Sequence, residues 1–139
     1  MHESSHHLMF HAAVVLLFGL LLGAPYARAI KRNAATHIVN SWRVAHLSIP
    51  IGATLMFAVA ALLPSLTVPA QVSWVIAVSL IISSYAFCIS TPLAAVTGER
   101  GLSSGSTGLG KLVYLGNMVG AWASVIAAVA LLYATFISL

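Results

Sequence analysis

Histidine is the residue type most able to do chemistry in this chain, which has six histidines and only two acidic residues among 139. His46 follows Trp42 by four residues and Arg43 by three, so the three side chains are predicted on one helix face. Imidazole is a common ligand of haem iron, and a guanidinium beside it suits the haem propionates. A histidine satisfied within a helix core is the other interpretation, and the residues alone leave both open.

A second group of histidines lies near the start of the chain. His7 and His11 have the i, i+4 spacing that places two imidazoles on one helix face, with His6 and Glu3 beside them. Such a face suits a metal ion. Solvated histidines at the membrane surface are the alternative, and His2 belongs to the same polar head.

One iron is not expected to join the two groups of histidines within a chain. His11 and His46 are predicted near opposite ends of their helices, about 20 Å apart in depth. His46 is therefore predicted to be the only iron ligand that this chain supplies, unless His37 or a second chain reaches the other face of the iron. An open iron face would favour chemistry over electron transfer.

Polar side chains inside apolar stretches are the other candidates for a site. Those in the third stretch are Ser83, Ser84, Tyr85, Ser90 and Thr91, and Asn117 lies in the fourth. A polar group inside a membrane is costly without a partner, which makes each a candidate for function. We predict catalytic roles for Tyr85, Asn117, Ser83 and Thr91. For the hydroxyls the alternative is a hydrogen bond back to their own helix.

The composition identifies the solvent around these side chains. Hydrophobic residues make up 60% of the chain and charged residues 6%, and the mean hydropathy is +1.03. Soluble domains have about a quarter of their residues charged. The chain is therefore predicted to be an all-α integral membrane protein, since helices satisfy their own backbone in lipid. The single cysteine, Cys88, is expected to be a small buried hydrophobe, with a thiolate ligand as the alternative.

Four stretches reach the roughly 20 apolar residues needed to cross a bilayer. They cover residues 8–27, 44–64, 72–96 and 111–138, and no linker divides them. We predict one domain over residues 1–139, a four-helix bundle. The first stretch also resembles a cleaved signal peptide, but no Lys or Arg precedes it, so we expect it to remain as a span.

The basic residues predict the orientation. All six lie in or beside the first and third connections: Arg28, Lys31, Arg32, Arg43, Arg100 and Lys111. The positive-inside rule places both connections in the cytoplasm and both termini outside. The net charge of +4 then reflects topology and attraction to anionic membrane lipid, and no nucleic-acid partner is expected.

Glycines four residues apart occur in the first and fourth stretches, at Gly19 and Gly23 and at Gly116 and Gly120. This spacing lets two helix backbones approach closely. We interpret both pairs as packing contacts that identify no partner.

Three segments resemble the bacterial styrene oxide isomerase family. SWRVAHLSIPIGATLMFAVAALLPSL, residues 41–66, is similar to the family's second span, with its Trp-x-x-x-His and Leu-Pro-Ser turn. HHLMFHAAVVLLFGLLLG, residues 6–23, is similar to the first helix, where His7 matches a histidine. ERGLSSGSTGLG, residues 99–110, is similar to the last loop. Hydroxylaminobenzene mutases share the layout more loosely.

The resemblance implies four-helix membrane proteins that assemble as trimers and bind haem b near subunit contacts. It implies that ferric iron acts as a Lewis acid on an epoxide oxygen and that a hydride shift gives an aldehyde. His46 corresponds to the iron ligand, and Arg43, Trp42 and His37 complete the predicted haem-binding set. We expect a homotrimer in the bacterial inner membrane.

The chain departs from the family at the predicted catalytic residues. The family has an asparagine on the second helix and an aspartate and a tyrosine on the third, where this chain has Gly52, Ser83 and Thr91. The chain has no aspartate at all. The resemblance therefore supports the haem more than the epoxide chemistry.

Three functions follow from these patterns. The first is a haem-dependent membrane isomerase acting on a small, apolar, oxygenated substrate, such as an epoxide or an N-hydroxy compound. The second is a membrane haem protein that transfers electrons or binds haem without catalysis. The third is a small membrane scaffold with no cofactor.

Overall fold

The computed structural model describes residues 3–102 and 108–139, and over these residues its regular secondary structure is helical, without strands. The helices are α1 (Glu3–Leu21), α2 (Gly23–Lys31), α3 (Thr36–Leu62), α4 (Ala70–Thr97) and α5 (Leu109–Ile137), with a 3-10 turn, η1, at Leu63–Ser65. Within the described ranges, α1 with α2, α3 with η1, α4 and α5 form four segments long and apolar enough to cross a membrane. The predicted all-α class and four spans are confirmed. His2 and the middle of the 99–110 motif lie outside the described residues.

The first span is interrupted, which hydropathy did not predict. α1 ends at Leu21 and α2 begins at Gly23, two residues before Pro25. Proline has no backbone N–H, and its ring clashes with the carbonyl four residues earlier, here that of Leu21. The chain nevertheless keeps its direction, because Tyr26 donates its backbone N–H to the Leu22 carbonyl at 3.2 Å.

The second span begins earlier than predicted. α3 starts at Thr36, eight residues before the expected position 44, so His37 lies in the first turn of a helix instead of in a loop. Residues 36–43 include polar side chains such as Asn40 and Ser41, which a search for apolar stretches excludes although they lie in the helix. His37 and His46 therefore belong to one continuous helix.

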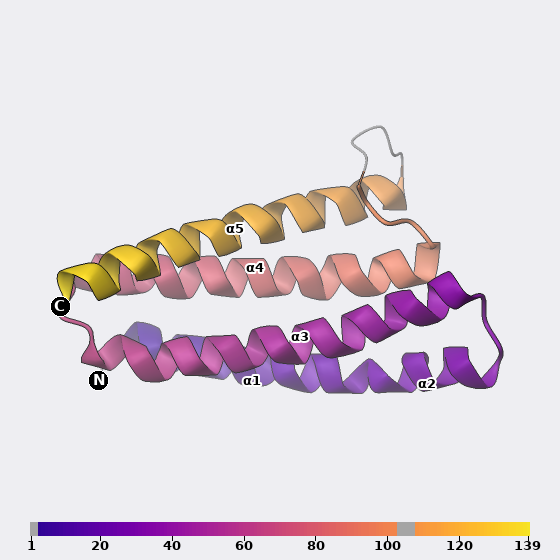
Figure 1. The fold of residues 1–139 in the computed structure, drawn as a ribbon, viewed down its shortest axis with the longest axis horizontal. Helices are drawn as coiled ribbons and strands as arrows, with labels where there is room; N and C mark the ends of the chain where they lie inside the picture. The colour runs from indigo at the N-terminus through magenta and orange to yellow at the C-terminus, as the bar shows by residue number, and fades with distance from the viewer. Residues whose placement is uncertain (1–2, 103–107) are drawn as a thin grey trace.

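The four spans run side by side, and Figure 1 shows the N and C labels at the same end of the bundle. The α2–α3 turn and the α4–α5 connection lie together at the other end, which we call the loop end. The basic residues of both connections therefore share one end. The side of the membrane that this end faces stays a prediction.

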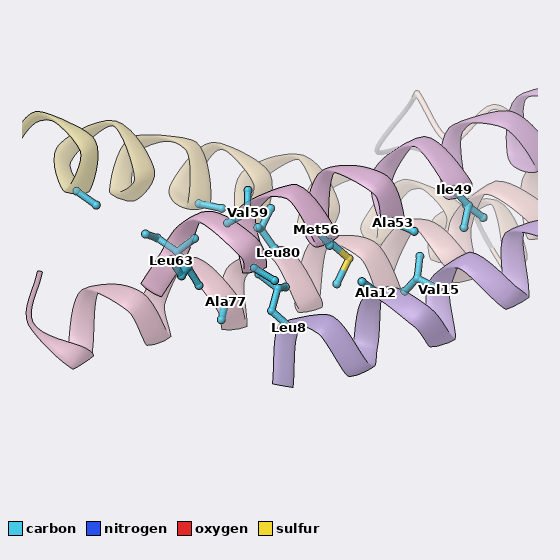
Figure 2. Packing of buried hydrophobic residues seen from close by; sticks show 14 of the residues in the cluster. Leu8, Ala12, Val15, Ile49, Ala53, Met56, Val59, Leu63, Ala77 and Leu80 are labelled. Atoms are coloured by element: carbon cyan, nitrogen blue, oxygen red, sulfur yellow. The ribbon is translucent and has the colours of Figure 1, made fainter. Parts of the chain in front are cut away.

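The hydrophobic core lies among α1, α3 and α4. Figure 2 shows its side chains pointing toward one another from these helices: Leu8, Ala12, Val15, Ile49, Ala53, Met56, Val59, Leu63, Ala77 and Leu80. α5 packs mainly on α4 and adds small residues such as Ala127 and Ala134. Many large apolar side chains on the outer faces are exposed, as a lipid-facing surface requires.

Both glycine pairs pack inside the chain. A Cβ at Gly19 would lie 2.6 Å from Cδ of Pro50 in α3. A Cβ at Gly116 would lie 2.8 Å from Cβ of Ser90 and 3.3 Å from the Ala86 carbonyl oxygen in α4. These contacts confirm the packing interpretation. The glycine faces pack against helices of the same chain.

Replacing Gly116 by alanine should destabilise the α4–α5 contact. Neither a Cβ nor a backbone carbonyl can rotate away from the new methyl group, so we expect Gly116→Ala to lower the free energy of unfolding by about 1–3 kcal/mol. Thermal unfolding of the detergent-solubilised protein, followed by circular dichroism, measures the effect.

Gly52→Ala in α3 is the matched control. A Cβ at Gly52 meets no described atom within 4 Å, so the change should leave stability unchanged or raise it by up to about 1 kcal/mol, the usual helix preference for alanine. Equal melting temperatures for wild type and Gly116→Ala would contradict the close approach of α4 and α5.

Candidate functional site

The side chain of His46 is held by the backbone of α1. Its Nδ1 lies 3.0 Å from the carbonyl oxygen of Gly19. A carbonyl oxygen only accepts hydrogen bonds, so Nδ1 is the nitrogen that carries the hydrogen. In the neutral ring Nε2 then keeps its lone pair, which is the arrangement found in metal-ligating histidines. His46 therefore presents Nε2 as a candidate ligand atom.

Two residues of α2 complete the surroundings of the imidazole. A Cβ at Gly23 would lie 3.1 Å from Cε1 of His46, so the glycine leaves just enough room for the ring. The ring of Tyr26 lies 6.0 Å away between centroids and is tilted by 32°. Sequence reasoning did not assign Gly19, Gly23 or Tyr26 to this site. The only signal was the glycine spacing, which identified a close contact but not its partner.

Trp42 and Arg43 lie on the same helix as His46, one turn nearer the loop end. Arg43 is exposed, whereas Trp42 is half-buried and packs against the core. Three residues correspond to about 4.5 Å along a helix, so the guanidinium is one helical turn away from the imidazole. Arg43 and His46 thus place a guanidinium and an imidazole within one turn of α3.

A cavity of about 440 Å³, which we call the inner cavity, lies on another face of α3. Its lining combines residues of α1, α3, α4 and α5, and it includes Gly52, Ser83, Thr91 and Asn117. Gly52, Ser83 and Thr91 are the three positions at which the sequence resemblance implies a departure from the family's polar residues. The structure therefore brings them together, although their catalytic roles stay predictions.

Two hydroxyl groups of the inner cavity donate their hydrogens to backbone carbonyl oxygens. Ser83 donates to the carbonyl oxygen of Gly120 at 2.8 Å, and Thr91 donates to that of Phe87 at 2.8 Å. The amide nitrogen of Asn117 donates to the Arg100 carbonyl oxygen at 3.4 Å. Ser83 thereby ties α4 to α5, whereas Thr91 bonds back to its own helix. The free lone pairs of both hydroxyls can only accept hydrogen bonds.

The inner cavity has no acid or base of its own among the described residues. Its lining there consists of aliphatic side chains, Phe87, Met56, hydroxyls, glycine and one amide. A cavity of this kind can bind and orient an apolar molecule. No ionisable group in this described lining can donate a proton to the bound molecule.

His46 and the inner cavity lie on opposite faces of α3. Leu55 lines the cavity and follows His46 by nine residues, which is two and a half turns of a helix. Gly19, Gly23 and Tyr26, which contact His46, belong to the side of α3 that packs on α1 and α2. Within one chain, α3 therefore stands between the candidate iron ligand and the cavity.

His37 faces a second cavity, of about 850 Å³, at the loop end. It precedes His46 by nine residues, so its side chain also lies on the opposite face of α3 from His46. Nε2 of His37 is 3.9 Å from the position of a Cβ at Gly98. The described chain thus offers no way for His37 and His46 to clamp one iron within a single copy.

Tyr85 is not among the described residues that line these two cavities. Its hydroxyl is hydrogen-bonded to Nδ1 of His11 at 2.9 Å, and the two rings meet edge to face. His7 stacks obliquely on Trp74, with ring centroids 5.4 Å apart. Both pairs belong to the α1–α4 contact near the termini. A catalytic role for Tyr85 stays a prediction, and the geometry gives it no contact with the cavity.

His6, His7 and His11 line one open cavity with Glu3, but their side chains do not form a metal-binding cluster. Within residues 3–102 and 108–139 there is no group of three or more His, Cys, Asp or Glu side chains that could hold a metal ion. His11 instead turns toward Tyr85 and His7 toward Trp74. The spacing of His6, His7 and His11 was therefore not sufficient to predict a metal site.

Comparison with known protein families gives a match that covers nearly the whole chain. The family model described as styrene oxide isomerase matches residues 4–136. No curated protein and no solved structure matches the chain. The matched range includes every helix that builds the His46 site and the inner cavity. This four-span membrane protein belongs to the styrene oxide isomerase family.

Proposed function

We propose that this protein is a haem-b-dependent membrane isomerase that rearranges a small, apolar, oxygenated molecule, an epoxide or an N-hydroxy arene. Membership of the family supports an isomerase. The observation that carries the haem is the hydrogen bond from His46 Nδ1–H to the Gly19 carbonyl, because it leaves Nε2 free to ligate iron. The described lining of the inner cavity is mostly apolar and has no acid or base. This supports a bound cofactor as the source of the catalytic group.

The residues around His46 fit a haem. His46 Nε2 would hold the iron, Arg43 would pair with a propionate, and Trp42 would contact the porphyrin edge. Bound ferric haem supplies a Lewis acid, which polarises a C–O or N–O bond without net redox change. The role of the Gly19 carbonyl is to fix the imidazole tautomer and to strengthen His46 as a ligand.

The inner cavity would bind the substrate. Its apolar lining takes up the hydrocarbon part, and Asn117 donates its second N–H to a substrate oxygen. The acceptor lone pairs of Ser83 and Thr91 bind the O–H or N–H hydrogens of an N-hydroxy arene, which an epoxide lacks. The open space at Gly52 admits a bulkier group than a side chain at this position would allow. We therefore expect a substrate that differs from styrene oxide in shape.

Two copies are needed to combine these parts. Because His46 and the inner cavity lie on opposite faces of α3, we propose that the cavity of one copy meets the haem on His46 of the partner subunit. The family resemblance supports a trimer, with the basic loops in the cytoplasm of a bacterial inner membrane. Exposed apolar side chains on α3, such as Ile51 and Leu55, offer contact area beside the cavity.

Removing the proposed iron ligand should remove the haem. We expect His46→Ala to reach the membrane at wild-type levels but to lose the Soret band, because no other imidazole lies on that face of α3. His37→Ala is the matched control and should keep the band. Arg43→Ala should retain haem with weaker affinity, since it loses a propionate contact and not the iron bond. Full haem occupancy in purified His46→Ala would contradict this prediction and would show that another residue ligates the iron.

The haem-loaded protein should be an oligomer. Native mass spectrometry of the detergent-solubilised protein should give the mass of three chains with haem. A particle with the mass of one chain that still carries haem at full occupancy would contradict the shared site.

Styrene oxide itself should be a poor substrate. Removing one aimed polar group from an active site costs about a hundred- to a thousandfold in rate, and three such groups are replaced here. We expect aldehyde formation by the ferric protein to stay near the level of His46→Ala. Rapid turnover would show that Gly52, Ser83 and Thr91 do not have the roles assigned to them.

The same preparation separates the isomerase from a haem protein without catalysis. A Soret band that shifts when imidazole is added indicates an open iron face and supports an isomerase with another substrate. A Soret band that does not respond to added ligands supports the electron-transfer or haem-binding alternative.

A further inference from the structure

The cavity at the loop end differs in chemistry from the inner cavity. Its lining includes His37, Asn40, Glu99 and Arg100, together with the hydroxyls of Thr36 and Ser41. Glu99 is one of only two acidic residues in the chain. Charged and amide side chains gathered around a volume of about 850 Å³ are suited to water and to small polar molecules.

The two cavities are adjacent, because Val44, Thr91 and Asn117 line both of them. The α3 residues on this side follow one another at helical spacing from the loop end inward: His37, Asn40, Ser41, Val44, Ser48, Ile51, Gly52 and Leu55. One face of α3 therefore changes from polar to apolar along a single continuous wall.

The wall of the loop-end cavity is built into the fold. Gly98 ends α4 with φ 72°, and Gly101 has φ 60°, conformations that suit residues without a side chain. A Cβ at Gly101 would lie 2.8 Å from the backbone nitrogen of Tyr114, so the chain lies directly against α5. The bond from Asn117 Nδ2 to the Arg100 carbonyl oxygen fixes the same segment where the two cavities meet.

We propose that the loop-end cavity is a hydrated vestibule that connects the inner cavity to the aqueous phase at the loop end. It admits small polar molecules, and it is the exit for the rearranged product. The hydrated path stands on the cavities alone, whereas the identity of the product rests on the proposed function.

If the vestibule is hydrated, water must reach Thr91 from one side of the membrane. Thr91 lies where the two cavities meet, a place that we call the junction. A thiol placed there can then ionise and react with a charged, membrane-impermeant reagent. Only the thiolate is the nucleophile, and each unit by which a pKa is raised in an apolar medium lowers its fraction about tenfold. Thiol labelling therefore distinguishes a hydrated position from a lipid-exposed one without any need for haem or substrate.

The experiment introduces single cysteines into the full chain with Cys88 replaced by alanine, in membrane vesicles of both orientations. Asn40→Cys probes the vestibule and Thr91→Cys the junction. Ile89→Cys is the matched control, since Ile89 lies two residues away on α4, is 57% exposed and is not among the described lining of either cavity. The probe is a cationic methanethiosulfonate, and Val44→Cys serves as the second junction position if Thr91→Cys does not fold.

We expect Asn40→Cys and Thr91→Cys to react from the loop side at least about tenfold faster than Ile89→Cys, in line with the thiolate fractions. Labelling of Asn40→Cys alone, with the junction as slow as Ile89→Cys, would overturn the path. Equal labelling of the junction from both sides would also overturn it, because water would then reach the cavity from the other end. Either result would leave the haem and its ligand untouched.

Discussion

The close approach of α1 and α2 to α3 is the contact on which the proposed site depends. Gly19 has two roles in it, since its missing side chain admits Pro50 and its carbonyl accepts the hydrogen of His46 Nδ1. Gly23 leaves room for the imidazole ring one turn further on. In a membrane, helices gain little from hydrophobic burial against one another, so small residues and hydrogen bonds of this kind determine which faces meet. The same contact thus joins the helices and prepares the ligand.

Whereas α1 and α2 pack closely on α3, the packing of α5 leaves a space beside α3. Gly116 and Gly120 hold α5 tightly against α4, and Ser83 adds a hydrogen bond to the Gly120 carbonyl. Because α5 packs mainly on α4, a continuous space remains between α3 and α5, and it becomes the inner cavity. The fold therefore separates a ligand side, where α3 meets α1 and α2, from a binding side. An assembly of copies is the simplest way to bring the two sides together.

The sequence predicted the elements better than it predicted their partners. Long apolar stretches identified the four spans, and the spacing of Trp42, Arg43 and His46 identified the face that carries the candidate ligand. Hydropathy could not show that α3 starts at Thr36, because polar residues at a membrane surface lower the mean hydropathy of a helix end. It also could not show that Tyr85 bonds to His11. Such partners depend on which helix faces meet, and hydropathy does not encode this.

The central claim is that the haem held by His46 of one copy lies at the inner cavity of another copy. Mixed oligomers test this claim most directly. Copies with His46→Ala keep an open cavity but lack the ligand, whereas copies with Gly52→Trp keep the ligand but fill the cavity. Oligomers containing both, isolated through two different tags, are examined for the Soret shift caused by imidazole. The account predicts a shift in the mixed oligomers that neither variant gives alone. Mixed oligomers whose haem remains unresponsive would contradict it.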